Sequence, residues 1–257
     1  MSQQEPEQEP ELVHYRVADR VASLVLDSQH NRNALSRRLV TQLYDALARA
    51  ADDDDVRVVL IRAEGPTFCS GADLSEASSG EGMERATGML VELQRRILAL
   101  SKPVVARVHG NVRAGGLGLV AAADVAVASH EAGFALNEVR LGLAPAAISL
   151  SVLPRMDDRA AAMAFLTGDV FTGRDAARTG LVTSSVPEDE LNLRVDEICA
   201  SLAKGSPQGL RETKTLLARP LLADIDAHGA ELAALSARLF GSEEARTAMA
   251  AFLKKRP

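Results

Sequence analysis

The sequence predicts an α/β fold. Three short runs rich in β-branched residues, at residues 56–61, 103–108 and 124–128, have the length and composition of buried strands. Segments long enough for helices separate these runs, so strand and helix alternate along most of the first part of the chain. Such alternation is typical of parallel strands joined by helical crossovers.

A hairpin and a helix are predicted ahead of these strands. Residues 12–17 and 21–26 are apolar runs on either side of a polar pair, which suits a tight turn between two strands. Residues 36–50 place leucines at three- and four-residue spacing, the pattern of an amphipathic helix, and Ser36 is a suitable N-cap.

The β signal fades after about residue 146, and helical patterns dominate from there to the C-terminus. We expect this part of the chain to form a helical cap or an oligomerisation element. The helical patterns lie at residues 157–166, 173–180, 188–203 and 207–218, and two further helices follow.

The composition favours a globular protein that acts on small molecules. The chain has 257 residues and is 47% hydrophobic, enough for a sizeable core. The net charge is −6 and the basic residues are scattered, so the sequence indicates no nucleic-acid-binding surface. Two cysteines without metal-ligand spacing fit a reducing compartment. We therefore expect a cytoplasmic protein with no metal site.

Residues 1–11 are predicted to form a disordered tail. They are acidic and rich in Pro and Gln, and they lack the apolar segment of a secretory signal. The most apolar stretch of the chain, residues 117–128, is far shorter than the roughly 20 residues of a membrane span. We expect no insertion into a membrane.

Two glycine-containing loops are the strongest candidates for a functional site. Residues 68–74 and 110–118 each come after a predicted buried strand, so both should open at the carboxyl edge of a parallel sheet, where such folds bind ligands. The second loop runs into a helix whose first N–H groups are free. Paired loops with free backbone N–H groups suit an anionic oxygen.

Other interpretations of these glycines carry less weight. A glycine loop often does no more than permit a tight turn or close packing of a helix on a sheet. A phosphate-binding P-loop is excluded because Gly116 stands where that motif needs a lysine. A dinucleotide site is disfavoured because its acidic residue would be Glu138, which lies well beyond the end of the next strand.

Both loops resemble the signature segments of the enoyl-CoA hydratase/isomerase (crotonase) superfamily. The similarity extends over almost the whole chain after the tail, with further matches at residues 33–35, 134–142, 171–182 and 206–214. It implies a crotonase-like α/β core, residues 12–200, built as a spiral of ββα units. It also implies a C-terminal helical region, residues 201–257, that packs trimers, which often pair into hexamers.

The resemblance also implies an acyl-CoA site, in which coenzyme A is part of the substrate and no separate cofactor is needed. The N–H groups of Ala72 and Gly115 correspond to the two donors of the oxyanion hole. Preorganised donors of this kind are each worth roughly 3 kcal/mol to a developing enolate. The residues expected beside the coenzyme A moiety are Asn33, Ala34, Ser70 and Gly71.

Glu138 is the candidate acid-base residue, and it stands alone. Two-carboxylate hydratases of the family carry a second glutamate three residues after the oxyanion glycine, where this sequence has Gly118. A single carboxylate most simply shuttles a proton between two carbons, as in the family's isomerases. However, residues 138–149 resemble members that hydrate branched or carboxylated enoyl-CoAs. Hydration is favoured, while isomerisation and a catalytically silent acyl-CoA-binding protein remain alternatives.

Three further residues are candidates for the part of the site that binds the acyl group. Gly118 in place of a glutamate should vacate volume and admit a bulkier acyl group. Arg113 and Arg140 are candidates to pair with a carboxylate on that group, although a solvent-facing or intersubunit salt bridge is the favoured role for each. His109 is expected to be a structural hydrogen-bonding residue.

Overall fold

The strands of the computed structural model form two sheets, and the structure describes residues 10–73, 75–76 and 80–254. The larger sheet has six strands in the order β1-β2-β3-β5-β7-β10, and the smaller has four in the order β4-β6-β8-β9. The strands of the larger sheet are β1 (Val13–Ala18), β2 (Val21–Leu26), β3 (Val58–Ala63), β5 (Val104–Val108), β7 (Val125–Ser129) and β10 (Ser184–Val186). Those of the smaller sheet are β4 (Thr67–Cys69), β6 (Asn111–Arg113), β8 (Gly133–Ala135) and β9 (Phe171–Thr172).

The first elements of the chain confirm the predicted hairpin and helix. Strands β1 and β2 pair antiparallel across a two-residue turn, whose residues Asp19 and Arg20 both have positive φ. That conformation matches the twist of the flanking strands. Helix α1 (Arg37–Asp52) begins at Ser36, whose side chain accepts a hydrogen bond from Leu39 N at 3.2 Å.

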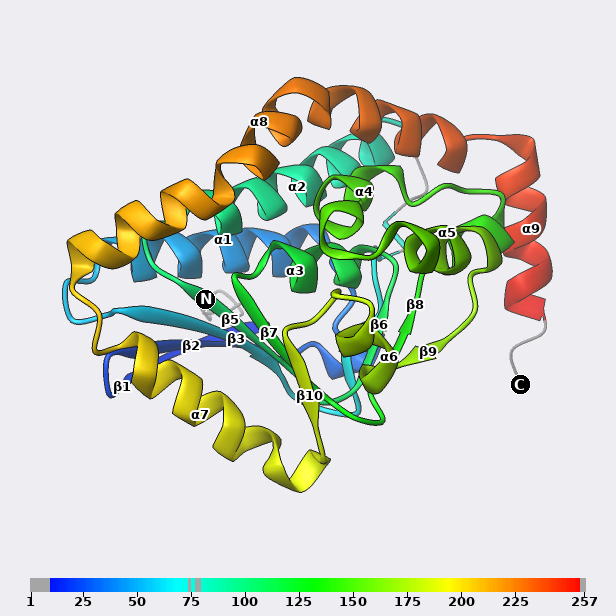
Figure 1. Ribbon diagram of the computed structural model, residues 1–257. Coiled ribbons are helices and arrows are strands. Elements are labelled where there is room, and N and C mark those ends of the chain that lie inside the picture. The colour runs from blue at the N-terminus through cyan, green and yellow to red at the C-terminus, as the bar shows by residue number, and fades with distance from the viewer. Residues whose placement is uncertain (1–9, 74, 77–79, 255–257) are drawn as a thin grey trace, which may run out of the picture.

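The predicted parallel strands are confirmed as well. From β2 to β10, each neighbouring pair in the larger sheet is parallel. Helices α1, α2 (Gly80–Ala99) and α3 (Gly115–Ala122) cover one face, and α7 (Leu191–Leu202) covers the other (Figure 1). Because both faces are buried, these strands are apolar almost throughout.

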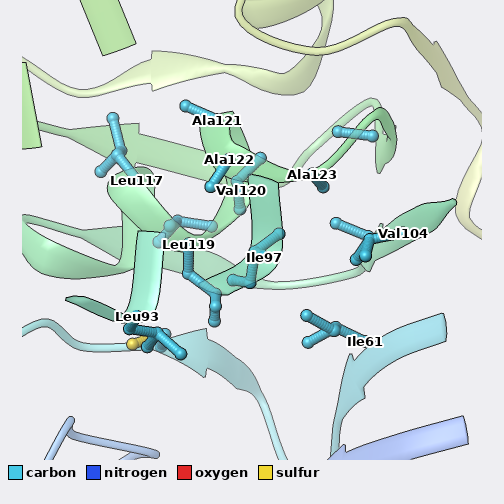
Figure 2. Packing of buried hydrophobic residues seen from close by; sticks show 14 of the residues in the cluster. Ile61, Leu93, Ile97, Val104, Leu117, Leu119, Val120, Ala121, Ala122 and Ala123 are labelled. Carbon is cyan, nitrogen blue, oxygen red and sulfur yellow. The ribbon is translucent and has the colours of Figure 1, made fainter. Parts of the chain in front are cut away.

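The helix α3 lies at the centre of the main core. Figure 2 shows its side chains packed among Leu93 and Ile97 of α2 and the strand residues Ile61 and Val104. Every residue of α3 is buried. A helix that is apolar on all sides can be stable only inside the molecule, so α3 is held rigidly behind the loop that precedes it.

The strands of the smaller sheet extend the sequence prediction. Strands β4, β6 and β8 follow β3, β5 and β7 respectively, and each pair is followed by a helix, α2, α3 or α4 (Ala146–Val152). This succession is the predicted spiral of ββα units. The second strand of each unit has only three residues, too few to show an alternating pattern, so the sequence analysis treated these segments as loops.

The C-terminal part corrects one prediction. A helix ending near residue 218 and two more were expected, whereas α8 (Pro207–Phe240) is continuous over 34 residues with Pro220 inside it, and only α9 (Glu243–Lys254) follows. Pro220 and Leu216 lie on the exposed face of α8, so water can solvate the carbonyl that lacks an N–H partner. Packing against α2 and α4 holds the helix together on its other face.

Several further elements complete the part of the chain that the structure describes. They are the helices α5 (Asp158–Thr167) and α6 (Gly173–Arg178) and the 3-10 helices η1 (Gln29–Asn31), η2 (Asn137–Leu141), η3 (Leu153–Arg155) and η4 (Glu188–Glu190). Among the described residues, no helix has the length and apolarity that crossing a membrane requires.

Candidate active site

The predicted catalytic residues meet at one edge of the smaller sheet. Strands β4, β6 and β8 are adjacent and parallel, so their carboxyl ends lie side by side. Ala72 follows β4, Gly115 follows β6 and Glu138 follows β8. The site was expected at the carboxyl edge of parallel strands, and the strands that form this edge are the short second strands, which follow those predicted from the sequence.

The loop after β4 and the loop after β6 are packed tightly together. A Cβ atom added to Gly71 would lie 2.9 Å from Ala114 Cβ and 3.0 Å from the Arg113 carbonyl oxygen, and Gly71 has φ +91°. Only glycine fits there. As a result Ala72 N comes close to Gly115, within 3.7 Å of the position that a Cβ on Gly115 would take.

In the part of the chain that the structure describes, both predicted oxyanion donors are free to bind an oxygen of the substrate. Within the described ranges, neither Ala72 N–H nor Gly115 N–H has a hydrogen-bond acceptor. Ala114, between β6 and Gly115, has φ 46° and ψ −121°, a conformation that non-glycine residues rarely adopt. Strain of this kind typically costs about 1–3 kcal/mol and is found where a backbone is held for function.

Glu138 lies in η2 and lines the same cavity as Ala72 and Gly115. Its side chain is 8% exposed, and its Oε2 atom has no hydrogen-bond partner in the part of the chain that the structure describes. Burial raises the pKa of this carboxyl to about 7, and one backbone hydrogen bond opposes the shift. The N–H groups of Gly142 and Leu143 donate to the Glu138 carbonyl oxygen and hold the turn in place.

Two cavities meet at these residues. The outer cavity has a volume of about 440 Å³ and a mixed polar and apolar lining, whereas the inner cavity has a volume of about 70 Å³ and a largely apolar lining. Both are lined by Ala72, Ala114, Glu138 and Phe240. The inner cavity is further enclosed by Leu35, Val40, Met83, Ala86, Thr87, Leu90, Gly115, Ala144, Pro145, Ala146, Ala147, Ile148 and Ser236.

The residues predicted to contact coenzyme A divide into two groups. Ala34, Ser70 and Arg113 line the outer cavity, and Gly71 supports it by the close packing described above. Asn33 does not line either cavity. Its side chain is buried and accepts from Ser28 N while donating to the carbonyl oxygens of Glu64 and Thr67, so it pins the loop that carries Ala34.

Gly118 does not open the space that was expected of it. A Cβ atom added there would lie 2.7 Å from Ile148 Cγ2 and 3.2 Å from Gln94 Cδ, and Gly118 lines neither cavity. The volume of the absent glutamate is therefore filled by Ile148 and Gln94. The expectation of room for a bulkier acyl group at this position was wrong, because the side chains of α2 and α4 close over the glycine.

Neither candidate arginine lies in the inner cavity. Arg140 is exposed, donates to the Thr167 carbonyl oxygen and pairs with Asp169. This agrees with the solvent-facing role that the sequence analysis favoured. Arg113 donates to backbone carbonyl groups of Val112 and Gly133 and to the Asn111 side chain, and no carboxylate partner occurs among the described residues.

His109 has the predicted structural role, since its Nε2 atom lies 2.6 Å from the Gly65 carbonyl oxygen. The sequence analysis missed the contribution of α8, from which Ser236 and Phe240 reach the cavities. No feature of the sequence marks these two residues, because they approach the site only when α8 packs across α2 and α4.

Two free N–H groups beside a buried carboxyl are an arrangement suited to one class of reaction. They suit a reaction in which a proton moves next to a carbonyl group whose oxygen gains negative charge. The chain belongs to the enoyl-CoA hydratase/isomerase family, whose model matches residues 16–257, and it is an enzyme of this crotonase superfamily.

Curated relatives and solved structures agree with this assignment. A putative enoyl-CoA hydratase of Thermus thermophilus is 34% identical over 244 residues, covering 92% of this chain and 96% of the relative. The 2,3-dehydroadipyl-CoA hydratase of Escherichia coli is 31% identical over 238 residues, covering 92% and 93%. The crystal structure of a putative enoyl-CoA hydratase from Mycobacterium avium paratuberculosis matches with a TM-score of 0.91 and 45% identity, covering 96% of this chain and 98% of that one.

Proposed function

We propose that this enzyme hydrates a 2-enoyl-CoA to a 3-hydroxyacyl-CoA, with Glu138 as the acid-base residue. The observation that carries the proposal is the meeting of Ala72 N–H, Gly115 N–H and the Glu138 carboxyl, whose Oε2 atom has no partner among the described residues, at one small cavity. The hydratases among its relatives, at 31% to 45% identity, support hydration as the reaction.

The geometry suggests how one carboxylate suffices. The Glu138 carboxylate takes a proton from water while the water oxygen forms a bond to C3. The electrons of the C2–C3 double bond move to the thioester oxygen, where Ala72 N–H and Gly115 N–H stabilise the enolate. Glu138 then returns the same proton to C2, so one water molecule is added and the carboxylate is regenerated.

The outer cavity is the proposed site of the coenzyme A moiety. It shares lining residues with the inner cavity, and its own lining includes polar groups, among them the cations Arg32 and Arg113. The phosphates of coenzyme A are anionic, and arginine is well suited to bind them. We assign Arg113 to this part of the substrate, because it lies outside the inner cavity that would receive the acyl group.

Labelled water tests the reaction. The purified enzyme is incubated with a short 2-enoyl-CoA in water enriched in oxygen-18, and the product is analysed by mass spectrometry. A 3-hydroxyacyl-CoA carrying the label is expected. Turnover that leaves all products free of the label would contradict hydration.

Isomerisation of a 3-enoyl-CoA to a 2-enoyl-CoA is the second candidate. It is favoured by the filled space at Gly118, which leaves Glu138 as the carboxyl group of the inner cavity among the described residues. Such a reaction needs only one group that removes a proton from C2 and returns it to C4. In the same labelled water, a 3-enoyl-CoA would then yield a 2-enoyl-CoA without oxygen-18.

A further inference from the structure

Among the described side chains that line the inner cavity, one has a polar group that the proposed reaction does not use. Ala72 N–H and Gly115 N–H are assigned to the thioester oxygen and Glu138 to proton transfer. Thr87 is not available, because its hydroxyl lies 3.0 Å from the Ala233 carbonyl oxygen and 3.1 Å from that of Met83. The remaining group is the hydroxyl of Ser236.

Ser236 has a free donor and is nevertheless buried. Ser236 is only 7% exposed, and its Oγ atom accepts a hydrogen bond from Ala147 N at 3.1 Å. A serine hydroxyl also has one proton to donate. No acceptor for that proton is found among the described residues.

Other hydroxyls in the helices of this protein behave differently. Thr41, Thr167 and Thr215 each donate to the carbonyl oxygen four residues earlier in the helix. Ser236 makes no such bond. A buried donor without a partner costs free energy, so its retention at the wall of a cavity points to a ligand that accepts from it.

We propose that Ser236 donates a hydrogen bond to the oxygen atom at C3 of the acyl group. This oxygen belongs to the water molecule before addition and to the 3-hydroxyl group afterwards. The proposal rests on the proposed hydration and adds to it a group that positions the water oxygen. Ser236 exchanges no proton. It holds the oxygen while Glu138 takes the proton, so water is presented to C3 in one orientation.

The small size of the inner cavity limits how far C3 of the acyl group can lie from Ser236. An apolar protein cavity of about 150 Å³ holds a benzene molecule, so ~25 Å³ is needed for each carbon atom. The inner cavity of about 70 Å³ thus accommodates roughly three carbons, C2 to C4, beyond the thioester carbon beside Ala72, which lines both cavities. An acyl group whose carbonyl lies at Ala72 and Gly115 therefore brings C3 within reach of the wall that Ser236 forms.

The discriminating experiment compares two ligands that differ by this one oxygen. The affinities of 3-hydroxybutyryl-CoA, in each enantiomer, and butyryl-CoA are measured by titration calorimetry. The wild-type enzyme should prefer one hydroxy compound by about threefold to tenfold, the effect of one neutral hydrogen bond. Ser236→Ala should bind both ligands equally, and Ser236→Thr should keep the preference because it keeps the hydroxyl.

The ratio of affinities separates binding from structure. Ser236→Ala also removes the acceptor of Ala147 N–H, which should weaken the binding of both ligands to the same extent and leave their ratio unchanged. Ser149→Ala is the matched control, because Ser149 is in the first turn of α4, donates to the Ala146 carbonyl oxygen and lines neither cavity. It should bind like the wild type.

The outcomes also separate this inference from the proposed function. If Ser236→Ala retains the preference for the hydroxy compound, the role of Ser236 is refuted while labelled water still decides hydration. If the wild-type enzyme incorporates no oxygen-18 and has no preference, both proposals fail. Incorporation of the label together with a preference that disappears in Ser236→Ala and returns in Ser236→Thr supports both.

Discussion

Glu138 combines burial, a carboxyl oxygen without a partner among the described residues, and a raised pKa in one side chain. Its environment disfavours the charged form, because the inner cavity is apolar and Oε2 has no hydrogen bond within the described ranges. A carboxyl whose pKa lies near the working pH can both accept and donate a proton. In the proposed reaction Glu138 transfers the proton, and the N–H groups of Ala72 and Gly115 stabilise the negative charge on the thioester oxygen.

The activity of the enzyme should follow the titration of Glu138. Because the reaction starts from the carboxylate, kcat/KM should rise with pH and level off above about pH 7, the pKa to which burial raises this group. Glu138→Gln keeps the size of the side chain but removes the base, so turnover should fall roughly a hundredfold to ten-thousandfold. Near-normal turnover of the variant, with coenzyme A binding and folding intact, would rule out this residue as the base.

Glu138→Gln should also change the dependence of stability on pH. A carboxyl whose folded pKa is raised is destabilising when ionised, so its cost grows as pH rises from about 4.5 to about 7 and is complete above that range. The variant should therefore be more stable than the wild type at pH 8, by at most about 3 kcal/mol, and equally stable near pH 4. Urea unfolding at both pH values measures the difference, and equal stabilities at pH 8 would argue against a desolvated carboxyl.

At the level of elements, α8 links the C-terminal region to the core. Lys214 is buried in this helix and its Nζ atom donates to Asp124 Oδ2 at 2.7 Å and to the carbonyl oxygens of Ile97 and Lys102. Asp124 Oδ2 also accepts a hydrogen bond from Val104 N at 2.7 Å, which fixes the start of β5. One lysine thus connects α8 with the end of α2 and the start of β7.

Replacing this lysine should be costly. Lys214→Met removes the cation from a partly buried carboxylate and the donor from two carbonyl groups, and we expect a loss of about 3–5 kcal/mol in the free energy of unfolding. Arg95→Met is the control, because its ion pair with Asp226 also joins α2 to α8 but is about half exposed. It should cost no more than about 1 kcal/mol. Similar losses for both variants in urea unfolding would show that burial of Lys214 contributes nothing special.

The whole molecule presents an apolar surface beside the active site. Met163, Leu166 and Val170 are respectively 67%, 74% and 62% exposed, and they lie in or just after α5, which packs against η2. Monomeric proteins rarely expose several large apolar side chains together. We expect this surface to be covered by a second copy in a trimer or hexamer, the assembly that the sequence resemblance implies.

Oligomerisation through this surface is open to a direct test. Light scattering should report a trimer or hexamer for the wild type, and Leu166→Glu should dissociate it by placing a charge in an apolar interface. Leu217→Glu changes an equally exposed leucine on α8 and should leave the assembly intact. A monomeric wild type would contradict the assembly, and dissociation by Leu217→Glu alone would move the interface to the C-terminal region predicted from the sequence.

The sequence by itself determined the local and repetitive features of this protein. The hairpin, the parallel strands of the larger sheet and α1 follow from patterns within a few residues of one another, and the loops around Ala72 and Gly115 follow from motifs of similar length. Glu138 as the remaining carboxylate was visible from the same motifs. These features depend on backbone preferences and periodicity, which a linear sequence displays directly.

Tertiary structure decided everything that depends on contacts between distant segments. Three-residue strands such as β4 exist only because neighbouring strands pair with them. The space at Gly118 is filled by side chains of α2 and α4, and the hydroxyl of Ser236 reaches the cavity from α8, which runs unbroken past Pro220. The pKa of Glu138 is raised by burial that these helices create. Packing across large sequence separations leaves no periodic signal, so only the folded chain reveals it.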